Sequence, residues 1–535
     1  MLLAIMTQPG MAIAGLAWVL AGKRVRGWNA LCLAAATHRD AYRWWIARAE
    51  PAVLRNYAPS ANPARPRIEA VILDAAADPI AAAATRESLF VAFGAEIAPW
   101  VAAVQLAGCR TLADGDTPAD VALAMVPADE CHWVLPIRAG DLVSPTLDGL
   151  LGGLLLDDAP DLLYWDEDRL VAGQRATPWI KPDWDRRLFG ARDGLTGACL
   201  VRLNQGDRRS DAGRGGDWPQ FLRARSGQCR PPPRHLPLVL THRAAGSGAM
   251  PAAARTALPQ SVSVSVIVPT RDGAALLEAC LVGLAKTQFP GSHEVIILDN
   301  DSIEPRTIAL FQRLEQSGAA RIIACPGPFN FAALANHGVA EATGELVCLL
   351  NNDIEVADPT WLARMAAYAV AGDVGAVGAR LLFPDGSIQH AGVALGVGDA
   401  AGHVEKGAVP DDVPGSPWHA IDRTVSAVTG ACLLVSRDKY LAVGGMDAAA
   451  FAVDFNDVDL CLRLAERSWQ TVYCANASLV HHESKSRGRR RTGPDQARFE
   501  RELANLRERW HTDRIVDRYH SPLFRRQSER CLLAF

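Results

Sequence analysis

The distribution of apolar residues along this 535-residue chain predicts strands that alternate with helices. In the first half, the short apolar runs 68–73 and 132–135 are typical of buried strands, and 79–93 between them is typical of a helix. Strands that alternate with helical segments favour an α/β domain whose neighbouring strands are parallel.

A second series of the same kind occupies the second half of the chain. The run 264–268 predicts a strand that ends at Pro269, 274–286 predicts an amphipathic helix, and 294–298 predicts a buried strand that closes on Asp299. We therefore expect two tandem α/β domains, each built on a doubly wound, mostly parallel sheet.

The apolar run 346–350 (LVCLL) predicts a further buried strand, and Asn351, Asn352 and Asp353 follow it directly. Ligands of open α/β sheets bind outside the carboxyl ends of the strands, so a carboxylate there can hold a divalent cation and, through it, phosphate oxygens. The alternative interpretation is a strand that stops in an Asx turn.

The two series resemble one another, which predicts an internal duplication. The pentapeptide TGACL occurs at 196–200 and again at 429–433, and Pro-Thr occurs at 145–146 and again at 359–360. Aligning the Pro-Thr pairs puts Arg138 where the second copy has its Asn-Asn-Asp element, with Asp141 nearby. Because an arginine repels a cation, we expect the first copy to be a degenerate structural or binding relic.

Residues 204–260 are rich in Gly, Arg and Pro, which marks a boundary, and we place the break at 245–260. The predicted organisation is an N-terminal helical or interfacial segment, a degenerate first domain, a linker, a second domain that carries the chemistry and a C-terminal tail, at 1–60, 61–244, 245–260, 261–510 and 511–535.

Composition excludes several classes of protein. A net charge of −4 argues against broad nucleic-acid binding, which needs a basic surface. The 12 cysteines form no C-x-x-C pair, so neither a disulfide framework nor a structural zinc site is indicated, and a reducing, cytoplasmic compartment fits best.

The N-terminal segment contains an uncharged run at 11–22 that is followed by Lys23, Arg24 and Arg26. This run is too short to span a bilayer comfortably, and its charges follow the apolar part instead of preceding it as in a signal peptide. Residues 28–49 mix tryptophan with arginine, which suits either an anionic membrane surface or packing on another domain.

Eight motifs follow one another through residues 262–510, and in this order they are specific. Together they resemble the family 2 glycosyltransferases with the A-type nucleotide-sugar fold, in particular the tandem, rhamnosyltransferase-like bacterial members. The first copy resembles a shorter, degenerate partner through YWDEDR and KPDW. The eight motifs are VSVIVPTRD, VIILDNDS, FNFAALANHGVAEATGELVCLLNNDIEV, SIQHAGVALG, TGACLLV, GGMD, FNDVDLCLRL and LVHHESKSRG.

The resemblance implies a uridine- or thymidine-type nucleotide at the carboxyl edge of the sheet. Backbone groups of Pro269 and the hydroxyl of Thr270 are expected to face its base or ribose, and Asp299 is expected to accept the pyrimidine N3–H. Asp272 fits either a ribose contact or the N-cap of the following helix, and the cap is the favoured interpretation. An Asx-turn cap is the alternative for Asp299.

The resemblance also implies a Mg²⁺ or Mn²⁺ site at Asn351, Asn352 and Asp353, which occupy the place of the family's D-x-D signature without its first carboxylate. A histidine after a later strand is expected to complete it, and we favour His482 slightly over His481, with a surface histidine pair as the alternative. The basic run that includes Lys485 and Arg487 is expected to meet the leaving diphosphate or an anionic lipid carrier, or else is solvated.

The general base is the last predicted site. The family often shows Glu-Asp at the position of Asn456-Asp457, so Asp457 inherits the role of general base and Asn456 is the departure. Asp459 reads as a helix cap or an acceptor contact, and Asp454 as a less favoured base.

The expected function is inverting transfer of a sugar from a UDP- or dTDP-linked donor to a saccharide or lipid-linked acceptor in cell-surface polysaccharide assembly. A peripheral association with the inner membrane is part of this expectation. The alternative is a non-catalytic scaffold that binds nucleotide or carbohydrate.

Overall fold

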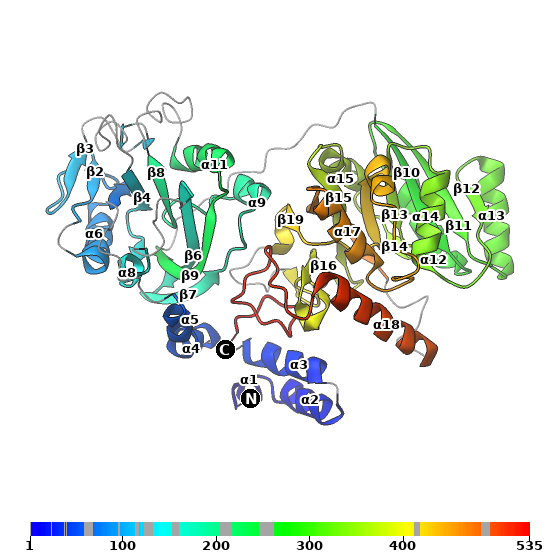
Figure 1. The fold of residues 1–535 in the computed structure, drawn as a ribbon, viewed down its shortest axis with the longest axis horizontal. Helices are drawn as coiled ribbons and strands as arrows, with labels where there is room; N and C mark the ends of the chain where they lie inside the picture. The colour runs from blue at the N-terminus through cyan, green and yellow to red at the C-terminus, as the bar shows by residue number, and fades with distance from the viewer. Residues whose placement is uncertain are drawn as a thin grey trace.

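Two α/β units lie side by side in a computed structural model of the chain, and the N-terminal helices and the C-terminal segment lie against them (Figure 1). The predicted fold class, two tandem α/β domains, is confirmed. The structure describes residues 2–22, 24–36, 38, 40–57, 68–94, 97–112, 117–118, 120–121, 132–151, 160–203, 217–244, 262–410, 418–482 and 493–534.

The first sheet has the strand order β3-β2-β1-β4-β8-β6-β9-β5, with β7 paired to β6. Pairs among β1 to β4 are parallel, whereas β8 runs antiparallel to both β4 and β6. Its strands are β1 Ile68–Leu73, β2 Trp100–Ala102, β3 Arg110–Leu112, β4 His132–Arg138, β5 Leu142–Val143, β6 Leu162–Val171, β7 Gln174–Trp179, β8 Cys199–Leu203 and β9 Arg234–Arg243, and its helices include α6 Pro79–Phe93, α8 Leu147–Leu151, α9 Arg186–Ala191 and α11 Trp218–Gln228.

The second sheet repeats this order as β12-β11-β10-β13-β20-β15-β21-β14, with β16 paired to β15 and β19 to β21. Its strands are β10 Ser263–Thr270, β11 Ser292–Asp299, β12 Arg321–Ala324, β13 Leu346–Leu350, β14 Ile354–Glu355, β15 Val374–Leu382, β16 Ile388–His390, β19 Arg423–Val425, β20 Cys432–Ser436 and β21 Gln470–His481, and a separate hairpin joins β17 Val393–Leu395 to β18 Ala401–His403. The helices are α12 Ala274–Ala285, α13 Pro305–Ser317, α14 Phe331–Glu341, α15 Trp361–Ala369, α16 Arg437–Ala442, α17 Asn456–Glu466 and α18 Gly493–Trp510.

The central strand β13 shows why the apolar runs fold as they do. All five residues of LVCLL are buried, because β10 pairs with it on one side, β20 on the other, and side chains pack on both faces. A strand covered on both faces reads as a continuous apolar run, and its polar neighbours are left at its end.

The Gly-, Arg- and Pro-rich stretch 204–260 contains helix α11 and strand β9 of the first sheet domain, since β9 pairs with β6. Both elements precede the predicted break at 245–260. Strand β21 extends to His481, so this histidine is the last residue of the strand and does not follow it as expected.

The N-terminal helices are α1 Leu2–Thr7, α2 Pro9–Leu20, α3 Arg24–Ala36, α4 Ala41–Arg48 and α5 Glu50–Arg55. Within the described ranges, every helix is too short or too polar to cross a membrane. Trp45 of α4 is 1% exposed and packs with Ile180 and Val239 of the first domain and with Phe524 of the C-terminal segment, so packing on a domain accounts for this part of 28–49.

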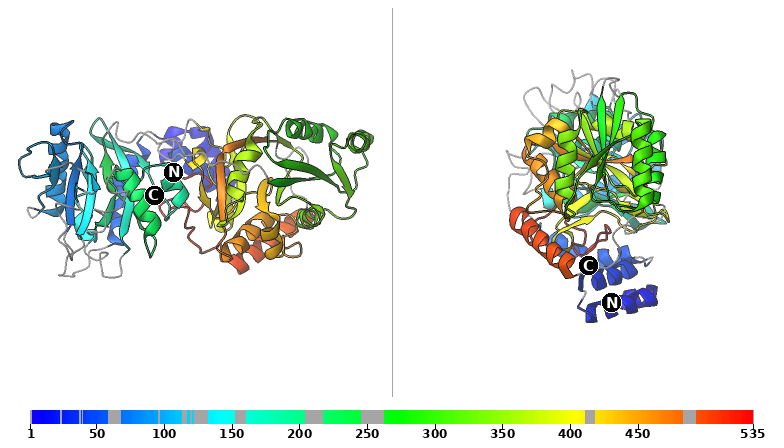
Figure 2. Two further views of the ribbon diagram at one scale, coloured as in Figure 1. Left: turned by 90° about the horizontal axis from the view of Figure 1, so that it is seen from above. Right: turned by 90° about the vertical axis from the view of Figure 1, so that its right-hand side faces the viewer.

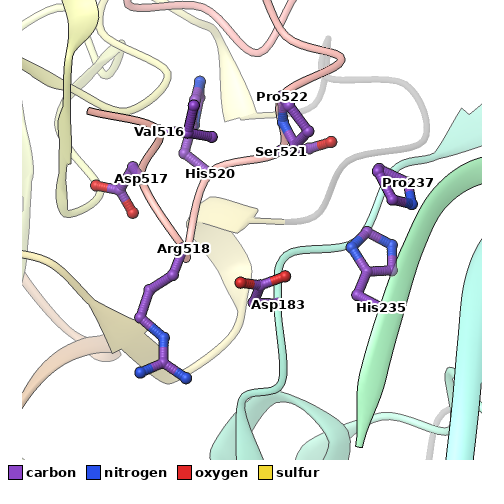
Figure 3. Close-up of a pocket in the computed structure, with 9 residues that line it drawn as sticks. All are labelled: Asp183, His235, Pro237, Val516, Asp517, Arg518, His520, Ser521 and Pro522. Atoms are coloured by element: carbon purple, nitrogen blue, oxygen red, sulfur yellow. The ribbon is translucent and has the colours of Figure 1, made fainter. Parts of the chain in front are cut away.

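Polar contacts join the two domains, which lie toward opposite ends of the long axis in Figure 2. Asp185 accepts hydrogen bonds from the backbone N–H and hydroxyl of Thr424, and Arg187 pairs with Asp373 at 2.9 Å. The C-terminal segment passes through the junction, where residues 516–518 and 520–522 line a pocket of about 220 Å³ together with Asp183, His235 and Pro237 (Figure 3).

Candidate functional site

Polar side chains meet where β10 and β13 end at the same edge of the second sheet. Thr270 is the last residue of β10, and its hydroxyl accepts a hydrogen bond of 2.8 Å from the Asn352 amide. Pro269 lies within β10 instead of ending it. The two parallel strands therefore bring the predicted nucleotide residues and the Asn-Asn-Asp element together, as the position of ligands in α/β sheets requires.

The carboxylate of Asp353 lies against a histidine from a distant strand. Its Oδ1 is 3.0 Å from His481 Nε2, and both residues are buried. The cause is the pairing of β14 with β21, in which Ile354 is opposite His481. The Asn351 amide also reaches His481 Nε2, at 3.4 Å.

His482 occupies a different place from the one predicted for it. Its ring contacts Glu355 at 2.9 Å, and only its backbone N–H bonds to Asp353, through the carbonyl oxygen. The ring of His481 thus lies beside Asp353, whereas the ring of His482 lies beside Glu355. The geometry favours His481 as the histidine of this site.

The donors at this edge suit a hard divalent cation only if a ligand completes the coordination. Asp353 and His481 offer a carboxylate and an imidazole, and Asn351 directs its amide nitrogen toward the same imidazole. Over the described residues there is no group of three His, Cys, Asp or Glu side chains that could hold a metal ion. Such a sparse set fits Mg²⁺ or Mn²⁺ bound jointly by protein and diphosphate, because Mg²⁺ is usually held by one or two carboxylates plus substrate phosphates.

Asp457 lies close to this edge, in the first turn of α17. Its Oδ2 accepts a hydrogen bond of 2.7 Å from the Gly430 N–H, and its Oδ1 accepts one of 2.8 Å from Val458. The next residue, Ala431, accepts the N–H of Asn351 at 2.9 Å. Desolvation by burial raises the pKa of Asp457, which suits a carboxylate that accepts protons.

Asp459 is neither a helix cap nor an acceptor contact. Helix α17 begins at Asn456, earlier than expected, after Phe455 in the left-handed region at φ 64°. Asp459 is fully buried, with one oxygen 2.8 Å from Arg463 and the other 2.8 Å from Arg509 of α18. It anchors α18 to α17.

The residues on the nucleotide side bind the backbone around them. Asp299 Oδ1 accepts the Ser302 N–H at 3.0 Å. This is the hydrogen bond expected from the alternative interpretation of Asp299 as an Asx-turn cap. Asp272 Oδ1 accepts the N–H groups of Ile303 and Glu304, so it holds the loop after β11. The favoured cap interpretation of Asp272 is wrong, because Gly273 is the N-cap of α12 and the Glu304 side chain accepts the first free N–H.

Two predicted site residues, Lys485 and Arg487, lie outside the described part of the chain. Gln389, in the motif SIQHAGVALG, was not singled out from the sequence, yet its Oε1 is 2.6 Å from His481 Nδ1. The sequence offered one signal, because Gln389 and His481 both lie in motifs of the family resemblance. No local spacing connects the two residues, since they are far apart in the chain.

The first domain carries a counterpart of this site. Leu142 of β5 is opposite His242 of β9, as Ile354 is opposite His481, so Asp141 and His242 take the places of Asp353 and His481. The Pro-Thr alignment, which put Arg138 in the place of the Asn-Asn-Asp element, is wrong by two residues. The register of paired strands is a safer guide than a shared dipeptide.

A guanidinium lies beside the aspartate of the first domain. Arg243 bonds to Asp141 at 3.1 Å and to Glu167 at 2.8 Å, and Glu167 also pairs with Lys181 at 2.9 Å, all of them buried. Burial would raise the pKa of Glu167, but Arg243 and Lys181 lower it to about 2. At this edge of the first domain, Arg243 and Lys181 therefore supply the positive charge that balances the buried carboxylates.

Comparison with known proteins decides the family of the second domain. Residues 265–395, which include β10, β13 and Asp353, match glycosyl transferase family 2. This part of the second domain is thus similar to glycosyl transferase family 2. The tandem arrangement with a degenerate first copy agrees with the repeated strand order.

Several proteins are similar to this chain over longer stretches. It is 34% identical to uncharacterized protein y4gI of Sinorhizobium fredii, over 69% of this chain and 46% of that protein. It is 33% identical to the O-antigen biosynthesis protein RfbC of Myxococcus xanthus, over 61% of this chain and 29% of that protein. The chain thus spans half or less of the length of these two relatives.

A shorter relative and a solved structure are also similar. The chain is 27% identical to an N-acetylglucosaminyl-diphospho-decaprenol L-rhamnosyltransferase of Mycobacterium tuberculosis, over 42% of this chain and 77% of that protein. A mannosyltransferase from Pyrobaculum calidifontis, solved with GDP-Man and Mn²⁺, matches 49% of this chain and 68% of its own with a TM-score of 0.35 and 17% identity.

Proposed function

We propose that this protein is an inverting glycosyltransferase that moves a sugar from a UDP- or dTDP-linked donor to a saccharide or lipid-linked acceptor in cell-surface polysaccharide synthesis. One observation carries the proposal. Gly430 and Ala431 hydrogen-bond to Asp457 and to Asn351, so a candidate base and a candidate diphosphate site share one edge of the sheet. The printed names of the relatives, O-antigen biosynthesis protein and L-rhamnosyltransferase, support the reaction class.

The donor is proposed to bind with its nucleotide over the ends of β10 and β11. The Thr270 hydroxyl and the backbone beside Pro269 would contact the ribose or base, and Asp299 would accept the pyrimidine N3–H. Asp272 holds the loop 302–304 in place through two backbone hydrogen bonds of 2.7 and 2.8 Å. A fixed loop favours binding because less conformational entropy is lost when the nucleotide enters.

The diphosphate is proposed to lie near Asp353, with Asn351 and His481 as the other protein donors and Asn352 tying the element to Thr270. A Mg²⁺ or Mn²⁺ ion held there would act as a Lewis acid that stabilises the leaving diphosphate. The initial preference for His482 gives way to His481, because the His482 ring contacts Glu355. Lys485 and Arg487 remain proposed contacts of the diphosphate or of a lipid carrier.

Asp457 is proposed to act as the general base. Its carboxylate takes the proton from the acceptor hydroxyl while that oxygen bonds to the anomeric carbon, and the bond to the diphosphate oxygen breaks on the opposite face. The anomeric configuration is thereby inverted. The pKa of Asp457 is raised by burial, which brings a carboxylate nearer to the strength that general-base catalysis needs.

A peripheral position at the inner membrane, on the cytoplasmic side, is part of the proposal. The first two helices expose Ile5, Met6, Ile13 and Leu20, and Leu20 is 87% exposed. Apolar side chains on short helices suit the boundary between headgroups and acyl chains, where a lipid-linked acceptor would be found.

The test is release of nucleoside diphosphate from UDP- and dTDP-sugars, with and without saccharide or lipid-linked acceptors. Acceptor-stimulated release in the presence of Mn²⁺ supports transfer. Firm nucleotide binding with no turnover for any donor and acceptor pair would instead favour the scaffold alternative.

A further inference from the structure

The buried side chain of Gln389 contacts His481 at two points. Its Oε1 lies 2.6 Å from the ring Nδ1, and its Nε2 lies 3.4 Å from the backbone carbonyl oxygen of the same residue. Gln389 is in β16, which pairs with β15, so its backbone is fixed by the sheet. The histidine that faces Asp353 is thus held on its other side by a side chain of β16.

These two contacts settle which way the amide points. A backbone carbonyl oxygen only accepts hydrogen bonds, so the amide end that faces it must be the NH₂ group. The carbonyl end of the Gln389 amide then faces Nδ1 of His481. Because that oxygen only accepts, Nδ1 must carry the proton.

The position of this proton determines what the other ring nitrogen offers. In a neutral imidazole with its proton on Nδ1, Nε2 carries a lone pair, and here Nε2 is 3.0 Å from Asp353 Oδ1. Two electron-pair donors that face one another at this distance repel unless a positive charge lies between them, either a proton that makes the ring an imidazolium or a bound cation. A histidine that donates its second N–H to a fixed acceptor is the usual arrangement of a metal ligand.

The first domain supports the same conclusion by contrast. There His242 Nδ1 is held by the carboxylate of Asp168 at 2.7 Å, and Arg175 lies 2.6 Å from the other oxygen of Asp168. Both domains therefore fix the same ring nitrogen of the equivalent histidine. The first domain, which has its own guanidinium, holds this nitrogen with a carboxylate. The second domain, which has the proposed cation position, holds it with a neutral amide.

We propose that Gln389 is a positioning residue that keeps His481 in the Nδ1–H tautomer, so that Nε2 presents its lone pair toward Asp353 and a divalent cation. The tautomer itself follows from hydrogen bonds within the protein. The use of that lone pair by a cation rests on the proposed function.

The experiment uses the full-length protein with ¹⁵N-labelled histidine and no added metal. Long-range ¹H–¹⁵N correlation spectra distinguish a protonated Nδ1 from a protonated Nε2, and loss of a signal in His481→Ala assigns it. We expect the wild type to show a single His481 tautomer with the proton on Nδ1, and Gln389→Met to show a mixture. Gln496→Met is the matched control, because Gln496 is exposed on α18 and bonds only locally, to Glu500.

Mn²⁺ affinity, measured by calorimetry, is the second readout. We expect Gln389→Met to weaken it by about 10–100-fold, the usual effect of losing a residue that orients a metal ligand, and Gln496→Met to leave it unchanged. Thermal unfolding of each variant shows whether it is folded.

The outcomes separate the positioning role from the proposed function. A wild-type spectrum with a proton on Nε2 of His481, whether alone or together with one on Nδ1, overturns the inference, even if Gln389→Met does not fold. A folded Gln389→Met protein with wild-type tautomer and Mn²⁺ affinity also overturns it. A tautomer that depends on Gln389 in a protein that binds no Mn²⁺ supports the positioning role and removes the metal from the proposed function.

Discussion

Replacement of Asp457 by asparagine tests the proposed chemistry most directly. The two side chains have the same shape, but an amide cannot take up a proton, so general-base catalysis worth about 10²–10⁴-fold should be lost. This loss corresponds to about 2.7–5.5 kcal/mol in the activation free energy. Donor affinity should barely change, because Asp457 contacts Gly430 and Val458 and not the proposed nucleotide site.

The cost of this substitution to the fold can be worked out separately. Asp457 accepts one backbone N–H on each oxygen, and asparagine retains a single accepting oxygen, so one hydrogen bond is lost. Such a loss leaves one backbone N–H without an acceptor and reduces the free energy of unfolding by about 1–3 kcal/mol. Thermal unfolding measured beside the rate separates this effect from catalysis.

The pH dependence of the reaction rate is an independent test of the same variant. Burial raises the pKa of Asp457, so the carboxylate protonates, and the base is lost, at a higher pH than for an ordinary aspartate. In the wild type, kcat/KM should fall as the pH drops through this raised pKa. In Asp457→Asn the slow residual rate should no longer show that acid limb.

The control has to be chosen from the structure. Asp459→Asn is unsuitable because Asp459 is buried between Arg463 and Arg509, whereas Asp438 is exposed on α16, and Asp438→Asn should leave rate and stability unchanged. Released nucleoside diphosphate is measured with a matched acceptor. Near-normal turnover of Asp457→Asn would refute the assignment and transfer the role of base to Asp454.

Three further predictions concern the edges of the two sheets at which the strands have their carboxyl ends. Asp353→Ala should weaken both Mn²⁺ and donor binding in calorimetry, and an unchanged metal titration would remove this residue from the site. His481→Ala should weaken Mn²⁺ binding far more than His482→Ala, and the reverse order would restore the preference for His482. Arg243→Met should lower the free energy of unfolding by about 3–5 kcal/mol, since it leaves Glu167 buried with one cation fewer, and should not alter Mn²⁺ affinity. A stability loss below 1 kcal/mol would contradict the role given to Arg243.

The sequence predicts best where a structural rule acts locally. LVCLL is an uninterrupted apolar run, so a buried strand with polar residues at its end could be expected without any partner being known. The same holds for 79–93, which forms α6 with these bounds. Thr270, Asn352 and Asp353 could be placed at one edge because parallel strands end on the same side of a sheet.

Prediction fails where the partner of a residue is distant in the chain. Asp459 looks like a residue of a helix start, but Arg509 is fifty positions away and decides its role. Asp272 precedes a helix, yet its carboxylate bonds across the edge to the loop after β11. Gln389 and His481 are brought together by strand pairing alone, and neither sequence pattern nor composition records that pairing.

The two strand ends that carry the histidines show how one position separates the domains. Strand β9 ends in His242-Arg243, and the second-domain strand ends in His481 followed by His482, so the residue after the facing histidine is arginine in one copy and histidine in the other. The longer arginine side chain reaches Asp141 and Glu167, whereas His482 bonds to Glu355 and leaves Asp353 to His481. In the first domain a guanidinium of the chain itself thus lies beside the buried carboxylates, whereas in the second domain the equivalent aspartate lies beside a histidine. The cation proposed for the second domain would take the place that this guanidinium holds in the first.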